Sequence, residues 1–123
     1  MILLGDNLIP YEELILIDSI WDIEHSLPNS TLIYNYDENL LTYCNKNKLN
    51  SAIIVTSIKE AIYSNALGAK YIICEKKLAK NIQKIAENYM FDSKVLAIIE
   101  QEKEIEDIAL AEIDGLIYKD LLK

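Results

Sequence analysis

Short apolar runs alternate with helical patterns along the whole chain, and this alternation constrains the fold more than any other feature. The runs are continuous rather than alternating apolar and polar, which is typical of strands buried on both faces of a parallel sheet. Six such runs are present: Leu14–Ile17, Leu32–Tyr36, Ala52–Val55, Tyr71–Cys74, Val95–Ile99 and Leu116–Tyr118.

The segments between these runs carry amphipathic helical periodicity. One apolar stripe runs from Ile58 to Ala66, and a longer one runs from Leu78 to Tyr89. Ser57, followed three residues later by Glu60, has the spacing of a capping box that starts a helix. Gly68 then follows at the position where a helix ends in the left-handed conformation.

Strands and helices in this alternation predict an α/β domain built on a parallel sheet. A chain of 123 residues is one domain, residues 1–123. We expect a three-layer α/β/α open sheet of five or six mostly parallel strands, of the flavodoxin-like or Rossmann-like kind. The alternative is half of an eight-stranded βα barrel, because the run at Ile15 and its helix start repeat at Ile53.

The charge composition limits the classes of partner. The net charge is −8, and all twelve basic residues are lysines. This balance predicts no nucleic acid and no anionic membrane as partner. The start of the chain has no basic segment, and no apolar run is long enough to span a bilayer, so we expect a cytoplasmic protein. Cys44 and Cys74 form no short pairing motif and are expected to be reduced thiols.

The charge is unevenly distributed along the chain. Residues 1–50 carry eight acids and two lysines, and residues 95–123 carry eight acids and three lysines. Residues 51–94, in contrast, carry four acids and seven lysines. The middle third is therefore the segment expected to attract an anion.

Candidate binding residues follow the predicted strands, because parallel sheets bind ligands beyond the carboxyl ends of their strands. The candidates are Asp18, Asp37, Thr56, Ser57, Glu75, Lys76, Lys77, Lys80 and Glu100. The four acids among them could hold Mg²⁺ together, but capping of helix starts is the interpretation we favour. The lysines lie where they oppose a helix dipole, and a bound small anion would relieve that repulsion.

No cofactor or metal is expected from the motifs. The chain has only three glycines, too few for a dinucleotide-binding fingerprint or a Walker-type phosphate loop. The single histidine, His25, lies in an acidic segment without an evident nucleophile. No residue is predicted to be catalytic.

Two resemblances add to these expectations. Leu67-Gly68-Ala69-Lys70-Tyr71-Ile72-Ile73 resembles the strand entry of phosphate-binding and aldolase-type TIM barrels. As a whole, the chain resembles a family of small epsilonproteobacterial α/β proteins of unknown function, and that resemblance implies no activity.

Two function hypotheses follow, and they leave open whether the chain is an enzyme. The first is a non-catalytic binding or protein-interaction module that associates with itself or with a protein partner. The second is a small enzyme, or the remnant of one, that binds a phosphorylated or Mg-linked metabolite at the carboxyl ends of the strands. A polar pocket at those ends would favour the second hypothesis, and a filled edge would favour the first.

Overall fold

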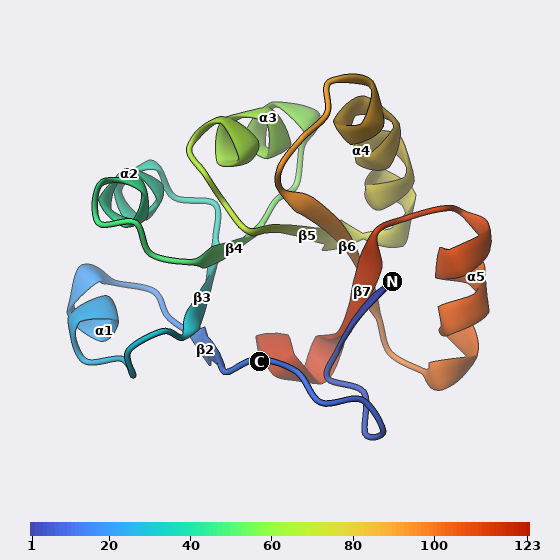
Figure 1. Cartoon of the computed structure of the whole chain (residues 1–123), viewed down its shortest axis with the longest axis horizontal. Coiled ribbons are helices and arrows are strands. Elements are labelled where there is room, and N and C mark those ends of the chain that lie inside the picture. Colours follow the sequence, from blue (N-terminus) through green and yellow to red (C-terminus); the bar gives the residue numbers. More distant parts are fainter.

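The computed structural model describes all residues, 1–123, as one curled parallel sheet with helices along its outer side (Figure 1). The strands are β1 Ile2–Leu4, β2 Leu14–Leu16, β3 Thr31–Asn35, β4 Ser51–Ile54, β5 Tyr71–Glu75, β6 Lys94–Ile99 and β7 Gly115–Tyr118. The helices are α1 Ile20–Glu24, α2 Glu38–Lys46, α3 Ile58–Ala66, α4 Lys76–Asn88 and α5 Ile105–Leu110, with 3-10 turns η1 Glu102–Glu104 and η2 Lys119–Leu122. The predicted α/β class and parallel sheet are confirmed.

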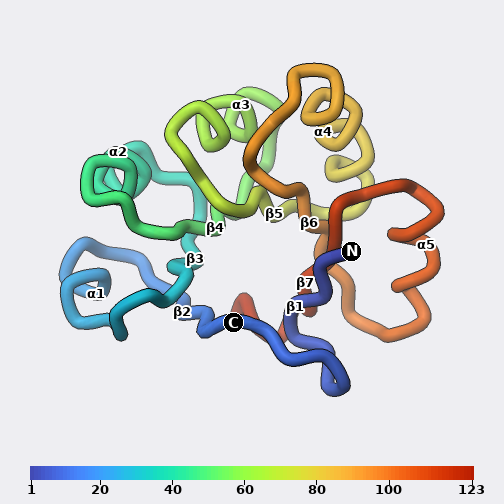
Figure 2. The backbone as a smooth tube through the Cα atoms, in the orientation of Figure 1, coloured from blue at the N-terminus to red at the C-terminus, as the bar shows by residue number.

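The strand order shows how the sheet is wound. It is β1-β7-β6-β5-β4-β3-β2, and every neighbouring pair is parallel. From β2 to β7 each strand lies next to its predecessor in sequence, so the chain winds in one direction. The helices consequently cover the convex side only, as Figure 2 shows most clearly. This arrangement matches the half-barrel alternative rather than the three-layer one, and the sheet has seven strands instead of five or six.

The seventh strand is β1, which pairs with β7 at one edge of the sheet. Gly115 allows this pairing, because a Cβ atom at that position would lie 2.4 Å from the carbonyl oxygen of Ile2. The other edge strand is β2, which pairs only with β3. The sheet is therefore not closed into a barrel.

The two faces of the sheet bury different cores. The larger core, 22 buried residues that include Leu41, Ile72 and Ile82, lies between the convex face and the helices. The smaller core has seven buried residues on the concave face, among them Ile33, Ile73 and Leu96. Leu121 and Leu122 of η2 pack against this smaller core, so the C-terminal turn covers part of the concave face. Curling thus buries the second face without a second layer of helices.

Four helices end in the same way. The residue after each C-cap has positive φ, namely Lys48 (55°), Gly68 (83°), Met90 (52°) and Glu112 (59°). The next amide then bonds to the carbonyl oxygen five residues earlier, as in Leu49 to Cys44 (2.9 Å) and Phe91 to Ala86 (2.8 Å). These are Schellman motifs, and the prediction for Gly68 is confirmed.

None of the helices combines the length and apolar character needed to cross a bilayer. The longest, α4, carries four lysines. Both cysteines are buried, and neither forms a disulfide.

Candidate functional site

Four of the predicted binding residues meet in one cleft at the carboxyl ends of β5, β6 and β7. Glu75, Lys76 and Lys77 come from the junction of β5 with α4, and Glu100 follows β6. The cleft has a volume of about 910 Å³. Its other lining residues are Ile98, Gln101, Lys103, Glu104, Asp107 and Lys119.

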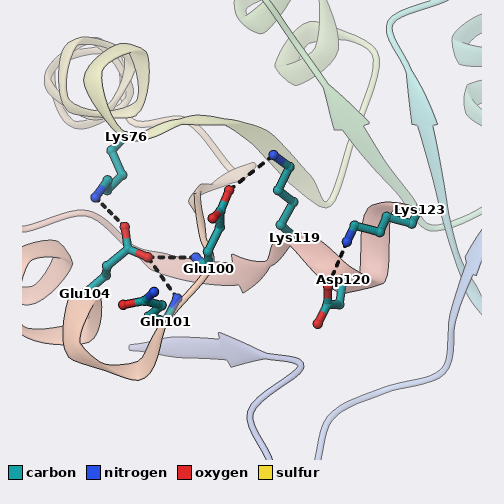
Figure 3. Close-up of polar contacts among 7 residues, drawn as sticks. All are labelled: Lys76, Glu100, Gln101, Glu104, Lys119, Asp120 and Lys123. Carbon is teal, nitrogen blue, oxygen red and sulfur yellow. Dashed lines mark hydrogen bonds and ion pairs between the residues drawn. The ribbon is translucent and has the colours of Figure 1, made fainter.

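Two ion pairs cross this cleft (Figure 3). Lys76 pairs with Glu104 Oε1, and Lys119 Nζ lies 3.2 Å from Glu100 Oε1. Glu104 also accepts hydrogen bonds through Oε2 from the amides of Glu100 (2.7 Å) and Gln101 (2.9 Å). Lys76 and these two amides lower the pKa of Glu104 to about 2, and Glu104 in turn raises the pKa of Lys76. The pair is therefore fully ionised at neutral pH.

Two lysines of the cleft have no acidic partner. Lys77 and Lys103 lack a carboxylate within 4.0 Å, whereas Lys76 and Lys119 are paired. Their ammonium groups are the cations of the cleft that remain available to a ligand.

The first turn of α4 adjoins these lysines and is uncapped. Its N-cap residue, Glu75, makes no side-chain cap hydrogen bond, and its first turn contains no acid. The start of a helix carries unsatisfied N–H groups and a partial positive charge. Lys80 belongs to the same helix but does not line the cleft.

The remaining predicted residues are spread along the edge of the sheet, where they serve as helix caps or bond to the capping acids. Asp37 Oδ1 accepts from the amide of Leu40 (3.0 Å) and caps α2. Ser57 Oγ accepts from the amide of Glu60 (3.2 Å) and caps α3. The amide of Thr56 donates to Glu60 Oε1 (2.9 Å), so Glu60 reaches back one residue further than the predicted capping box required.

Asp18 takes part in the same hydrogen-bond arrangement at the start of α1. Its amide donates to Asp22 Oδ2 (3.1 Å), while Ser19 Oγ accepts from the amide of Asp22. The nearby Asp22 carboxylate raises the pKa of Asp18. Asp22, Glu60 and Glu104 therefore each bind an amide four residues earlier, just beyond a strand. At these three places a carboxylate of the chain itself occupies the position that an anion would take.

A shared metal site is not formed by the acids. No group of three or more His, Cys, Asp or Glu residues lies close enough to hold a metal ion. The interpretation of the strand-end acids as caps holds in full for Asp37, whereas the Glu100 side chain forms an ion pair instead.

Both thiols are buried, and neither they nor His25 line the cleft. Burial raises the pKa of the Cys74 thiol to about 12, and burial also raises that of Cys44. His25 stacks on Trp21 with ring centroids 3.9 Å apart, in a separate groove beside β2. Neither cysteine would be a thiolate at neutral pH.

Sequence reasoning missed part of the cleft. Lys103 and Glu104 come from η1 and Asp107 comes from α5, which follow β6 after a short turn. Gln101 and Glu104 are three residues apart, like Ser57 and Glu60, and this spacing could have indicated a helix start after β6.

No family model matches this chain, and no match is found among curated proteins.

Proposed function

We propose that this chain is a non-catalytic binding module and that the charged cleft takes a small anionic ligand such as a phosphorylated metabolite. One observation carries the proposal: α4 begins at the cleft without a side-chain cap, beside two lysines that have no acidic partner. At α1, α2 and α3, in contrast, a side chain of the chain itself caps the helix start.

The physical basis is convergence of positive groups. Amide N–H groups at the start of α4, together with Lys77 and Lys103, would all donate to one anion. Lysine binds phosphate as a point charge rather than through the two-pronged geometry of arginine, which this chain lacks.

The acids of the cleft refine the ligand class. Four lysines and four carboxylates line the cleft, and two of each pair with one another in the two ion pairs. Glu75, Asp107, Lys77 and Lys103 form no ion pair and also line the cleft. A ligand that carries a positive group as well as an anionic one, or a phosphate that arrives with Mg²⁺, matches this balance better than a bare anion.

Binding rather than catalysis is proposed because of what occupies the concave face. In βα barrels the substrate lies at the mouth of the barrel, at the carboxyl ends of the strands. Here Leu121 and Leu122 follow β7 directly and pack against the concave core. The alternative, a small enzyme or enzyme remnant, would use the same cleft and predicts turnover of the ligand.

A thermal-shift screen tests the proposal. Inorganic phosphate, pyrophosphate and phosphorylated sugars, each with and without Mg²⁺, would be added to wild-type protein. A ligand at a hundred times its dissociation constant adds about 2.7 kcal/mol, which is a shift of several degrees. The shift should disappear in the double variant Lys77→Ala with Lys103→Ala. It should persist in the charge-matched control Lys46→Ala with Lys94→Ala, whose lysines do not line the cleft. A panel without any shift, or a shift that survives in the double variant, would contradict the proposal.

A further inference from the structure

A second space adjoins the charged cleft beside the C-terminal turn η2 and has a volume of about 440 Å³. This side pocket is lined by Glu100, Gln101, Tyr118, Lys119, Asp120 and Lys123. Glu100, Gln101 and Lys119 also line the cleft, so the two spaces meet along these three residues. A ligand held in the cleft can therefore extend into the side pocket.

An ion pair lies at the boundary between the two spaces. Lys119 Nζ is 3.2 Å from Glu100 Oε1, and Figure 3 shows this pair between the ion pairs formed by Lys76 and by Asp120. The two side chains are 55% and 64% exposed, so water competes for them, and an ion pair exposed in this way contributes little to stability. A ligand that bonds to both side chains can therefore replace their water without a large loss.

The side pocket differs from the cleft in its charge balance. Asp120 Oδ1 lies 3.2 Å from Lys123 Nζ, so both acids and both lysines of the side pocket are paired. The cleft, in contrast, contains Lys77 and Lys103 without an acidic partner. A phosphate group is therefore drawn to the cleft, because the side pocket offers it no unpaired cation.

Paired charges at the wall of a pocket match one class of ligand group. A carboxylate only accepts hydrogen bonds, and an ammonium group only donates them. A hydroxyl group does both, so one hydroxyl can donate to Glu100 and accept from Lys119. An apolar group would instead remove water from four charged side chains without replacing its hydrogen bonds, which is costly. The side pocket therefore suits a group rich in hydroxyls better than a hydrocarbon or a second phosphate.

Tyr118 supplies the one apolar surface of the side pocket. Its hydroxyl donates to Asp6 Oδ2 at 3.2 Å, and this bond holds the side chain in place. One apolar contact beside four charged groups matches the carbon skeleton of a polyhydroxylated compound, whose hydroxyl groups bond to the charges around it.

We propose that the ligand is a sugar phosphate, with its phosphate group in the cleft and its hydroxyl groups in the side pocket. This inference rests on the proposed function, because the phosphate is held by Lys77, Lys103 and the first turn of α4. It adds that Glu100, Lys119 and Asp120 recognise the sugar. The cleft and the side pocket, about 910 and 440 Å³, leave space beyond the phosphate for the sugar, since ligand sites typically measure about 300–1,000 Å³.

Isothermal titration calorimetry with inorganic phosphate, pentyl phosphate and ribose 5-phosphate tests the proposal. The two esters have the same number of carbon atoms and one phosphate each, but only ribose 5-phosphate carries hydroxyl groups on its carbon atoms. We expect the wild-type protein to bind ribose 5-phosphate at least 10-fold more tightly than pentyl phosphate. Pentyl phosphate should bind no more tightly than inorganic phosphate, because its hydrocarbon finds no apolar surface of matching size.

A double variant, Asp120→Ala with Lys123→Ala, isolates the side pocket. It removes one acid and one lysine, so the net charge of −8 is unchanged. Neither residue lines the cleft, and their side chains are 88% and 70% exposed, so folding should be retained and is checked by circular dichroism. This variant should bind ribose 5-phosphate at least 5-fold more weakly and inorganic phosphate as tightly as wild type. Glu13→Ala with Lys46→Ala, a charge-neutral change at exposed residues outside both spaces, should bind all three probes like wild type.

The outcomes distinguish failure of this proposal from failure of the proposed function. Equal affinity for ribose 5-phosphate and pentyl phosphate would overturn the sugar assignment while phosphate binding stands. The same holds if the Asp120→Ala, Lys123→Ala variant binds ribose 5-phosphate like wild type. If none of the three probes binds at millimolar concentration, the proposed function is overturned and this proposal with it.

Discussion

Glu12 and Tyr71 meet at the amino-terminal side of the sheet, where the Tyr71 hydroxyl donates to Glu12 Oε1 at 2.5 Å. Glu12 precedes β2 at one edge of the sheet, and Tyr71 begins β5 in the middle of the sheet. Thr31 Oγ1 (2.6 Å) and Lys70 Nζ (2.5 Å) donate to the second carboxylate oxygen, Oε2. One carboxylate thereby ties the segment before β2 to β3 and to the start of β5.

Replacing Glu12 by Gln should destabilise the protein at pH 7. The amide keeps one acceptor oxygen but loses the charge that strengthens three hydrogen bonds. Hydrogen bonds to charged groups contribute about 1.5–3 kcal/mol, and the partial exposure of this site reduces the sum. We expect a loss of about 1–2 kcal/mol in urea denaturation. Glu13→Gln, at an exposed neighbour without such bonds, should be neutral.

The same cluster predicts a pH dependence. Burial raises the pKa of Glu12, but the hydrogen bonds from Lys70, Thr31 and Tyr71 outweigh it and leave the pKa below its ordinary value of 4.5. The stabilisation is therefore complete well above pH 4.5 and is lost as the pH falls through the lower, folded-state pKa. The difference in stability between wild type and Glu12→Gln should shrink on acidification from pH 7 to pH 3. A difference that stays constant would contradict the assignment.

Tyr34→Phe should leave stability unchanged or raise it by up to about 1 kcal/mol. The Tyr34 side chain is 1% exposed, and its hydroxyl has no hydrogen-bond partner. Burial, with the Cys44 thiol nearby, strongly raises the pKa of this hydroxyl. A buried donor without an acceptor has lost its water contacts without compensation. Thermal unfolding measures the effect, and a loss above 1 kcal/mol would show that the hydroxyl does have a partner.

Substitutions at the positive-φ residues that follow α2 and α3 should change the free energy of unfolding in opposite directions. Lys48→Gly should stabilise by about 1 kcal/mol, because φ at this position is 55° and glycine adopts it without strain. Gly68→Ala, at the equivalent position after α3, should destabilise by a similar amount. A Cβ atom there would meet only Asn45 Nδ2 at 3.5 Å, so the expected loss comes from conformation and not from a clash. Equal signs for the two changes in the free energy of unfolding would refute the argument.

Gly115→Ala should release β1 from the sheet. The added Cβ would lie 2.4 Å from the Ile2 carbonyl oxygen, and β1 is held by only three residue pairs. We expect a loss of about 1–3 kcal/mol, as for overpacked sites. Amide exchange at Leu3 and Leu4 should accelerate, while exchange in β4 and β5 stays protected. Unchanged protection at Leu4 would show that the strands can separate slightly and remain paired.

Local patterns predicted most elements because they reflect local physics. The six apolar runs correspond to β2 to β7, with no end shifted by more than one residue, and Ser57 and Gly68 lie at the two ends of α3 as expected. β1 was missed although its run, Ile2–Leu4, is as long as the recognised run Leu116–Tyr118. Its place in the sheet depends on pairing with β7 at the other end of the chain, which no local pattern reveals.

The layering was harder to predict than the elements. Continuous apolar strands indicate that both faces of a sheet are buried, but not what buries them. Here the concave face is covered by the curl of the sheet and by Tyr71, Leu121 and Leu122, which no local pattern distinguishes from a second layer of helices. The same curl explains why only some of the predicted binding residues meet in the cleft. Residues after β5 and β6 converge, while Asp18 and Asp37, after β2 and β3, are used at their own helix starts.

Binding of an anionic ligand in the cleft beside α4 can be followed residue by residue by NMR, in a titration of ¹⁵N-labelled protein with pyrophosphate and Mg²⁺. We expect the amide signals of Lys76, Lys77 and Leu78 and those of Gln101 to Glu104 to shift with a single dissociation constant. The same titration of the Lys77→Ala, Lys103→Ala variant should leave these signals in place. Shifts confined to other residues, or none up to millimolar ligand, would contradict the claim.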